Sequence, residues 1–324
     1  MGTRPRRTAR PPGVDRRPPA GPSRALMRAA RLSPGSRWAA PVCLALFCVA
    51  LVAVGCSGDA GGLGASSTTS TTSTTSSGDP GTSGKGGGAG AGVTLTVSAA
   101  SDLALALDEL GAAFTEETGV MVTVNLGSSG QLAQQIEAGA PVDVFFSANR
   151  GYVQELLDKG VVTAGDVALY GLGRITLWTR ADSPLRLETV ADLRATQVKR
   201  VAIANPDHAP YGMAAREALR SAGLWEELQP KIVLAENVLQ ALQFADSGNV
   251  DAAIVARSLS VQGEGRWVLV PAESHAPIEQ TLAVIAASKN LEWARRFAEF
   301  VNGPQGRPAM REYGFVLPGE PGQG

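Results

Sequence analysis

From residue 93 onward, apolar and polar residues follow two alternating periods. Residues 93–97 read Val, Thr, Leu, Thr and Val, and this period of two predicts a β-strand. The residues Leu103, Leu107, Leu110 and Phe114 follow at spacings of four, three and four, which places them on one face of a helix. A strand followed by an amphipathic helix is the repeating unit of α/β folds with a parallel sheet.

The alternation of strand and helix continues to residue 313. The predicted strands cover residues 120–126, 142–147, 174–178, 200–204, 232–234, 251–256 and 280–287. The predicted helices begin after the turn at residues 127–130 and at Asn237, and further ones cover residues 152–159, 214–222, 291–301 and 304–313. We therefore expect an α/β fold, with residues 264–277 as a stretch of no clear pattern.

These elements are expected to form two lobes. We place a hinge near Tyr170, so that residues 171–278 form a second lobe of the same α/β type. Residues 279–318 are expected to return to residues 93–170 and complete the first lobe. A chain that crosses twice in this way leaves a cleft between the lobes.

The turn Gly127-Ser128-Ser129-Gly130 joins a predicted strand to a predicted helix. The first N–H groups of a helix have no acceptor within it, and the helix dipole makes this end attractive to an anion. Ser129 adds a hydroxyl, although a serine here also serves as a helix cap. Ser101 stands at the same kind of junction one unit earlier. Because both junctions fall at the carboxyl edge of a parallel sheet, we expect them to converge on one anion site.

Residues 1–55 have the composition of a targeting segment. Residues 1–37 hold ten Arg and one acidic residue, and residues 38–55 hold no charge. The apolar run 42–54 is long enough for the core of a signal peptide but short for a membrane span. We therefore expect this segment to be cleaved.

The apolar run ends in Ala53-Val54-Gly55-Cys56, which resembles a bacterial lipoprotein signal in which the cysteine receives lipid. Ala53 stands where Leu is usual, and an ordinary signal peptide or an uncleaved anchor is the alternative. Met27 is expected to be the true start, because the basic residues after it make a leader of normal length.

Residues 56–92 are a run of Ser, Thr, Gly and Ala with almost nothing to bury, and we expect a disordered tether. No cysteine follows Cys56, which excludes a disulfide or a cysteine-metal site downstream. Loss of residues 1–55 removes ten of the 29 basic and one of the 30 acidic residues, which leaves a net charge of about −10. Such a surface is wrong for nucleic acid.

Four segments, taken together, resemble the molybdate-binding proteins of bacterial ABC importers over residues 93–318. They read AASDL at 99–103, GSSGQL continuing to IEAGAPVD at 127–143, NPDHAPYG at 205–212, and NGPQ ending in YGF at 302–315. Their order and spacing carry the resemblance.

The resemblance implies the two-lobed, periplasmic-binding-protein-like fold of type II, with the ligand in the cleft. It implies a receptor, not an enzyme, that needs no cofactor and captures molybdate, and tungstate with it. Its expected partners are the permease of an ABC importer and its ATPase. The receptor is expected to be a monomer outside the cytoplasm, held by lipid at the outer face of the cell membrane.

In the family that this chain resembles, hydroxyls and backbone N–H groups from both lobes hold the oxyanion without a counter-charge, and the molybdenum is bound only as that oxyanion. Carried over by position, the contacts are Ser101, Asp102 through its backbone, Ser129, Tyr211, and Val238 through its N–H. Some relatives supply a further tyrosine from the strand where this chain has Ala256. That donor is missing here, and Tyr211 is expected to substitute for it.

The chemistry of the ion fits such a site. Molybdate and tungstate are dianions at neutral pH that only accept hydrogen bonds, so hydroxyl and N–H donors satisfy them. Sulfate is also a tetrahedral acceptor, and discrimination against it would rest on the size of the cavity. A second reading is therefore a receptor for sulfate, phosphate or a small organic anion.

An enzyme is the alternative from another class. The Gly127–Gly130 turn superficially resembles the nucleophile elbow of a serine hydrolase, with His275 as the base. That motif needs Gly at both two-residue offsets from the serine, which neither Ser128 nor Ser129 has. His208 and His275 are too far apart in sequence for a recognisable metal motif, and we expect both to be ordinary surface or loop residues.

Overall fold

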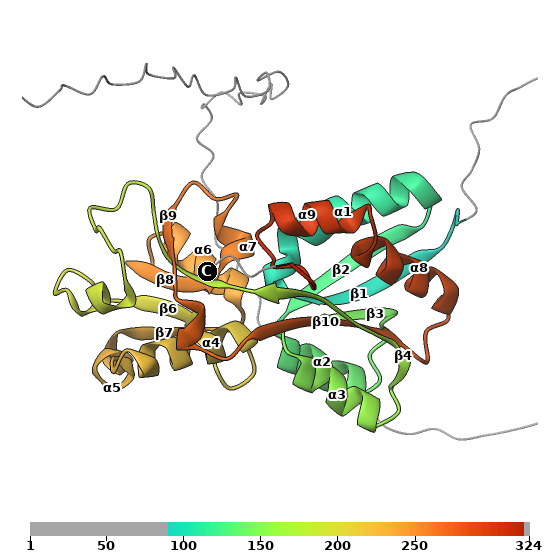
Figure 1. The fold of residues 1–324 in the computed structure, drawn as a ribbon, viewed down its shortest axis with the longest axis horizontal. Coiled ribbons are helices and arrows are strands. Elements are labelled where there is room, and N and C mark those ends of the chain that lie inside the picture. The colour runs from blue at the N-terminus through green and yellow to red at the C-terminus, as the bar shows by residue number, and fades with distance from the viewer. Residues whose placement is uncertain (1–89, 321–324) are drawn as a thin grey trace, which may run out of the picture. The chain divides into compact units, whose positions relative to one another are not determined.

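The computed structural model describes residues 90–320, which contain two five-stranded sheets (Figure 1). The first sheet has the order β2-β1-β3-β10-β4, and its strands are β1 (Thr94–Ala100), β2 (Met121–Gly127), β3 (Val144–Ser147), β4 (Val162–Gly173) and β10 (Ile278–Ile285). The second has the order β7-β6-β8-β5-β9, and its strands are β5 (Ile175–Thr179), β6 (Val201–Ala204), β7 (Ile232–Ala235), β8 (Ala252–Ala256) and β9 (Arg266–Leu269). We call each sheet with its helices a lobe, lobe I and lobe II, and the predicted α/β fold of two lobes is confirmed.

Helices cover both faces of the sheet of lobe I. They are α1 (Ala104–Thr118), α2 (Ser129–Glu137), α3 (Arg150–Asp158), α8 (Leu291–Asn302) and α9 (Gly306–Glu312). One core packs α1, α8 and α9 against one face, and a second core packs α2 and α3 against the other (Figure 1). β1 pairs in parallel with β2 and β3, whereas β10 runs antiparallel to β3 and β4.

The apolar stripe predicted for the first helix is buried. Leu107, Leu110 and Phe114 are each 1 or 2% exposed, and the ring of Phe114 meets that of Phe297 on α8 edge to face at 5.1 Å. The helix ends at Gly119, whose φ of 79° suits a residue without a Cβ. The spacing of four residues therefore fixed which face of α1 meets the core.

Lobe II repeats the arrangement of strands. β6 pairs in parallel with β7 and β8, and β5 runs antiparallel to β8 and β9. Its helices are α4 (Pro210–Ser221), α5 (Trp225–Leu228), α6 (Val238–Asp246) and α7 (Arg257–Ser260). Short 3-10 turns lie at Ser101–Leu103 in lobe I and at Val190–Arg194, Gln229–Lys231 and Ala272–Ser274 in lobe II.

The chain crosses between the sheets twice, and all of these elements belong to one compact unit. The first crossing lies between Gly173, at the end of β4, and Ile175, at the start of β5. The second lies between Leu269 and Ile278, where the chain leaves β9 and enters β10. The strands that the crossings join, β4 to β5 and β9 to β10, therefore lie beside the space between the lobes.

Some elements differ from the prediction. The strand β4 was not predicted, because its sequence holds Gly, Ala and Asp, and pairing with β10 holds it in place through a ladder with two irregularities. β9 lies in the stretch for which no pattern was found, and α5 was missed. The helix predicted from residue 214 begins at Pro210, where proline is favoured at the first helical position. Tyr211 therefore belongs to the first turn of α4.

The predictions for the leader at 1–55, the start at Met27, lipid on Cys56 and most of the tether at 56–92 lie outside the described residues.

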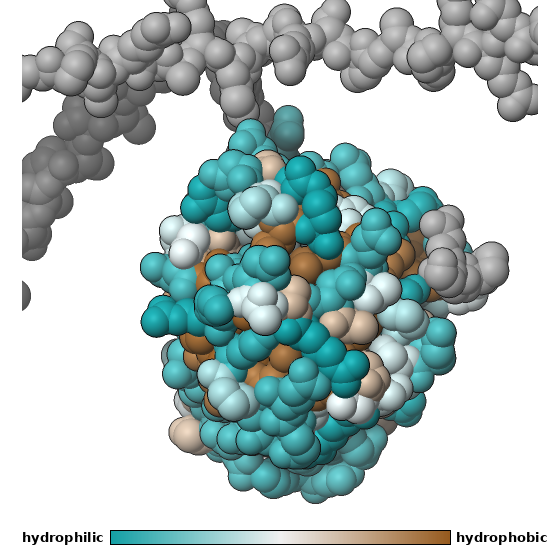
Figure 2. Space-filling view, turned by 90° about the vertical axis from the view of Figure 1, so that its left-hand side faces the viewer, coloured by the Kyte–Doolittle hydropathy of each residue, from teal (hydrophilic) through white to brown (hydrophobic). Residues whose placement is uncertain are grey.

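On the side of lobe II that Figure 2 shows, hydrophobic residues reach the surface in small areas separated by hydrophilic ones. Within residues 90–320, no helix is both long enough and apolar enough to span a membrane.

Candidate functional site

The two strand-to-helix junctions lie side by side at one edge of the first sheet. Since β1 and β2 are parallel and pair Ala100 with Gly127, the residues that follow both strands leave the sheet together. Ser101 opens the turn that leads into α1, and Ser129 is the first residue of α2. Both serines are buried, with 2% and 0% of their surface exposed.

A narrow cavity, of about 10 Å³, lies between the lobes beside these serines. Lobe I lines it with Ala100, Ser101, Asp102, Gly127, Ser128, Ser129 and Ala148, and lobe II with Ala209, Pro210, Tyr211 and Val238. Every residue that the sequence named as an oxyanion contact therefore lines this one cavity. None of the lining residues is a lysine or an arginine, so the lining carries no fixed positive charge.

The two serine hydroxyls are oriented by backbone amides. Ser129 Oγ accepts a hydrogen bond from the N–H of Ala148 at 2.9 Å, and Ser101 Oγ accepts one from the N–H of Leu239 in lobe II at 3.3 Å. Neither hydroxyl donates to any other group among residues 90–320, so the proton of each is available to an acceptor in the cavity. A hydroxyl whose lone pair is already engaged is a suitable donor to an anion.

The N-terminus of α6 brings an amide from lobe II. The helix begins at Val238, after the cap Asn237, whose side chain accepts from the N–H of Gln240 at 3.0 Å. The N–H of Val238 has no acceptor within its own helix, as at any first helical position. Because Val238 lines the cavity, this helix end and that of α2 both offer a positive dipole end to it.

A chain of buried side chains links Asp102 to lobe II and to both crossing strands. Asp102 Oδ2 accepts from the hydroxyl of Tyr211 at 2.8 Å and from Nε2 of Gln280 at 2.9 Å. The carbonyl of the Gln280 side chain accepts in turn from the hydroxyl of Tyr170 at 2.6 Å. Asp102 thus accepts hydrogen bonds across the cleft, in addition to lying in the first turn of its own helix.

Burial changes the protonation of Asp102. It raises the pKa of the Asp102 carboxyl from 3.8 to about 7, although hydrogen bonds from Tyr211, the backbone and Gln280 oppose the shift. The other carboxyl oxygen, Oδ1, is buried and has no partner among the described residues. Burial also raises the pKa of the Tyr211 and Tyr170 hydroxyls well above 10, so both keep their protons.

Gly173 makes room for this cluster. A Cβ at this position would lie 2.4 Å from the hydroxyl oxygen of Tyr211 and 2.9 Å from Nε2 of Gln280. Real Cβ atoms essentially never come so close, so any larger residue here would displace the side chains of Tyr211 and Gln280, whereas glycine leaves them in place. The Tyr211 hydroxyl lies there, directed at Asp102, and its oxygen is 3.0 Å from Gln280 Nε2.

Three residues around the cavity were not predicted from the sequence. Gln280 and Tyr170 lie behind Asp102, and the hydroxyl of Ser258 donates to the Asp102 carbonyl at 2.8 Å. Gln280 is fully buried in β10, but its strand also holds Glu279 and Thr281, so no sequence pattern distinguished it. Ser258 lies two residues beyond Ala256, the last residue of β8.

His208, and not His275, lies beside the candidate site. His208 Nδ1 is 2.7 Å from Ser128 Oγ, whereas the ring of His275 contacts the carbonyl of Ala276. The hydrolase alternative gains nothing from this pair. Ser128 also donates to the side-chain carbonyl of Gln131, and the N–H of Gly130, which an oxyanion hole would use, already donates to the backbone carbonyl of His208.

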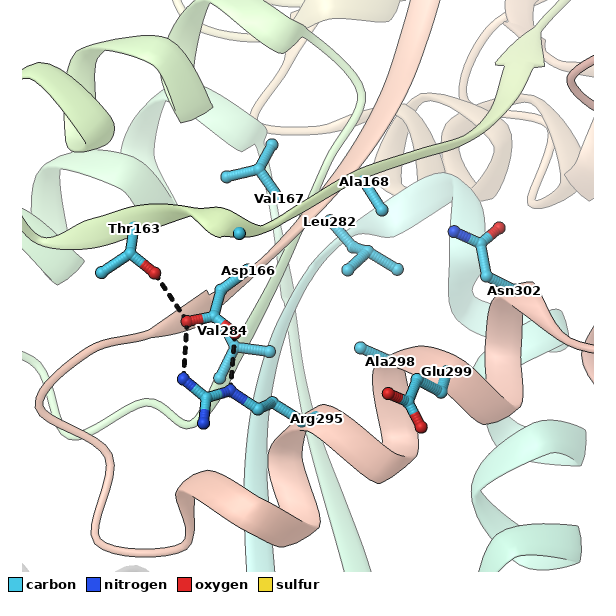
Figure 3. A pocket seen from close by; sticks show the side chains of 11 residues that line it. Thr163, Asp166, Val167, Ala168, Leu282, Val284, Arg295, Ala298, Glu299 and Asn302 are labelled. Carbon is cyan, nitrogen blue, oxygen red and sulfur yellow. Dashed lines mark hydrogen bonds and ion pairs between the residues drawn. The ribbon is translucent and has the colours of Figure 1, made fainter.

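A wider depression of about 440 Å³ lies on lobe I, between β4 and α8 (Figure 3). Three of its polar side chains face one another, because Arg295 Nε donates to Asp166 at 2.6 Å and Thr163 donates to the same carboxylate at 2.7 Å. The hydrogen bond from Arg295 lowers the pKa of Asp166 below its ordinary range. None of its lining residues belongs to the cavity between the lobes.

Residues 90–320 contain no cluster of three His, Cys, Asp or Glu side chains placed to hold a metal ion.

The sequence and the fold are similar to those of known solute-binding proteins. Residues 95–316 match the family model of bacterial extracellular solute-binding proteins. The molybdate-binding protein ModA of Rhodobacter capsulatus is 36% identical over 210 residues, which are 64% of this chain and 82% of that protein. A putative ABC transporter substrate-binding lipoprotein of Bacillus subtilis, YvgL, is 29% identical over 69% of this chain and 86% of its own length. The structure of the periplasmic molybdate-binding protein of Azotobacter vinelandii superposes with a TM-score of 0.66 and 31% identity, over 69% of this chain and 99% of that one.

Proposed function

Because the chain belongs to the family of bacterial extracellular solute-binding proteins, we propose that it is a receptor that captures molybdate in the cavity between its lobes. The observation that carries this proposal is the pair Ser101 and Ser129. Each hydroxyl oxygen accepts a hydrogen bond from a backbone N–H, which leaves its own proton to donate to an anion in the cavity. No lysine or arginine lines that cavity. The relatives named molybdate-binding proteins support the choice of ion.

The donor set suits an oxyanion that carries no proton. Molybdate and tungstate offer only acceptor oxygens, so hydroxyl and amide donors complete their hydrogen bonding, and we include tungstate as a ligand for this reason. We assign the contacts to Ser101, Ser129, the N–H of Val238 and the backbone of Asp102. Helix ends supply partial positive charge and leave the ion free to dissociate, as delivery requires.

Tyr211 is the fifth assigned contact, and its role depends on Asp102. In the structure its single proton is directed at Asp102 Oδ2. The hydroxyl turns to the ion when Asp102 carries its own proton, and the pKa of about 7 puts that state within reach at neutral pH. An ion with two negative charges beside Asp102 favours the protonated carboxyl further.

Asp102 also favours a second candidate, a receptor for phosphate. Phosphate at neutral pH carries a proton and needs an acceptor in its site. The Oδ1 oxygen of Asp102 is a buried acceptor without a partner among residues 90–320, on a residue that lines the cavity. Phosphate thus requires the ionised carboxylate of Asp102 as an acceptor, whereas molybdate favours the protonated carboxyl.

Molybdenum content tests the proposed function. The protein is dialysed against molybdate in excess sulfate, and bound molybdenum is measured by atomic emission. We expect one molybdenum atom per chain. A chain that takes up no molybdenum, yet binds phosphate, would support the second candidate.

We further propose that lipid on Cys56 anchors the receptor outside the cytoplasm, where as a monomer it passes its ligand to an importer permease and its ATPase. The lipoprotein among its relatives supports this proposal. Cys56→Ser followed by cell fractionation tests it, since the variant is expected to leave the membrane fraction and to change in size. A variant that stays membrane-bound at the wild-type size would rule out the anchor.

A further inference from the structure

His208 joins the two lobes outside the cavity. It lies in the loop that leads from β6 to α4, and its carbonyl accepts from the N–H of Gly130 in α2 at 3.0 Å. The hydroxyl of Tyr152 approaches the same carbonyl at 3.5 Å. On the ring side, Nδ1 lies 2.7 Å from the hydroxyl of Ser128. One residue of lobe II thus contacts three residues of lobe I, and it does not line the cavity itself.

The approach of His208 depends on a glycine. A Cβ at position 130 would lie 2.7 Å from the carbonyl oxygen of His208 and 2.8 Å from the hydroxyl oxygen of Tyr152. The His208 oxygen belongs to backbone, so it cannot turn aside as a long side chain would. Gly130 therefore lets the lobes approach more closely than any other residue at this position would.

The loop that carries His208 is held in shape by its own hydrogen bonds. The side chain of Asn205 accepts from the N–H of Asp207 at 3.0 Å, and the Asn205 carbonyl accepts from the N–H of Ala209 at 2.9 Å. Asn205 is tied to β7, because its N–H donates to the carbonyl of Ala235 at 2.7 Å. The His208 carbonyl is thus presented to α2 from a fixed position on lobe II.

A second contact spans the rim of the cleft beside His208. Gln131 Nε2 donates to Glu236 of lobe II at 2.9 Å, and the carbonyl of the same Gln131 side chain accepts from Ser128. Ser128 therefore connects the ring of His208 with the contact between Gln131 and Glu236. Neither Gln131 nor Glu236 lines the cavity.

We propose that His208 and Gly130 form a clamp that holds the cleft shut and sets the rate at which the bound ion leaves. The proposal rests on the proposed function, with molybdate as the ion, and assigns both residues a positioning role. The contacts of the clamp exist only when the lobes are together, so they stabilise the closed state without touching the ion. Removing them lowers the closed population and shortens the time that the ion stays bound.

Gly130→Ala tests the clamp, with Gly165→Ala in β4 as the matched control, because a Cβ at Gly165 meets nothing within 4 Å. In the full chain, bound molybdate is chased with excess tungstate and its release is followed by stopped-flow fluorescence. We expect Gly130→Ala to release molybdate at least tenfold faster, with an association rate within threefold of the wild type. Gly165→Ala should match the wild type in both rates.

A second measurement needs no ligand. Hydrogen exchange of the ion-free protein reports the amides of Gly130 and Leu239, which both donate across the lobes. We expect Gly130→Ala to exchange them faster than Gly165→Ala does. Should the wild type bind no molybdate, the proposed function fails, and this comparison still decides the clamp.

His208→Ala covers the case in which Gly130→Ala does not fold, since it removes the ring and adds no atom. We expect release to be about threefold to tenfold faster, with an unchanged association rate. Release at the wild-type rate in the folded clamp variants, with unchanged protection of the Leu239 amide, would overturn the proposal. A slower association with an unchanged release rate would also overturn it, because it would indicate damage to the cavity instead.

Discussion

Ser101 and Ser129 show how single residues define the candidate site. Each serine follows a strand and is buried. Each hydroxyl oxygen accepts a hydrogen bond from a backbone N–H, which limits the directions in which its own proton can point. Ser101 differs in one respect, because its amide partner Leu239 belongs to the other lobe. Loss of the Ser101 oxygen therefore removes both a donor to the ion and a contact between the lobes.

We expect Ser129→Ala and Ser101→Ala each to weaken molybdate binding by about tenfold to a hundredfold, since a hydrogen bond to a charged group contributes about 1.5 to 3 kcal/mol. Isothermal titration calorimetry measures the change. Ser247→Ala, at the exposed end of α6, is the control and should bind as the wild type does. Equal affinity of all three variants would exclude the serines as contacts.

Asp102 gives the ion-free protein a pH dependence. Below pH 3.8 the carboxyl is protonated in both the folded and the unfolded chain. As the pH rises from there to about 7, the unfolded chain loses this proton and the folded chain keeps it, so the free energy of unfolding falls. Above about pH 7 the loss is complete and amounts to on the order of 4 kcal/mol.

Asp102→Asn removes this dependence. We expect the stability of the variant relative to the wild type to increase between pH 4 and pH 7 and to stay constant above that range. Urea denaturation of both proteins at several pH values measures the difference, in which the other titrating groups cancel. A difference that does not change with pH would contradict the raised pKa.

At the scale of elements, the sequence predicted the helices and strands whose apolar residues recur with a clear period. The stripe on α1 and the serines at the starts of α1 and α2 were visible, because burial on one face dictates apolar spacing. β4 was not visible, since an edge strand that is held by its neighbour β10 needs no strong preference of its own. The cluster around Asp102 was not predictable either. Gln280 and Tyr170 meet only because the two crossing strands pair, and no local pattern encodes that pairing.

We expect Gln280→Leu to lower the free energy of unfolding by about 1 to 3 kcal/mol, because it leaves the buried hydroxyl of Tyr170 without its acceptor. Chemical denaturation measures the effect. Gln154→Leu, on the exposed face of α3, is the control and should change stability by less than about 0.5 kcal/mol. Equal effects of the two changes would show that the cluster contributes nothing.

At the scale of the whole molecule, the candidate site takes residues from both lobes. The cavity takes serines from lobe I and the end of α6 from lobe II, and contacts such as that of Gly130 with His208 hold the lobes together around it. Binding is therefore expected to be coupled to closure. The ranges predicted for the lobes, residues 93–170 with 279–318 and residues 171–278, remain a proposal about where these rigid parts divide.

Closure should be visible in solution. We expect saturating molybdate to reduce the radius of gyration of the wild type in small-angle X-ray scattering. Gly130→Ala should show a smaller reduction at saturation, because its Cβ keeps the lobes apart. An unchanged radius in the wild type would mean that the contacts to the ion come from one lobe alone.

Calorimetric titration of the wild type with molybdate, sulfate and phosphate at pH 7 tests the central claim most directly. A cavity of hydroxyl and amide donors predicts that molybdate binds most tightly and that sulfate binds more weakly because it is smaller. Phosphate is predicted to bind poorly, both to the wild type and to Asp102→Asn. Tighter binding of phosphate than of molybdate, lost in Asp102→Asn, would contradict the account and identify a phosphate receptor.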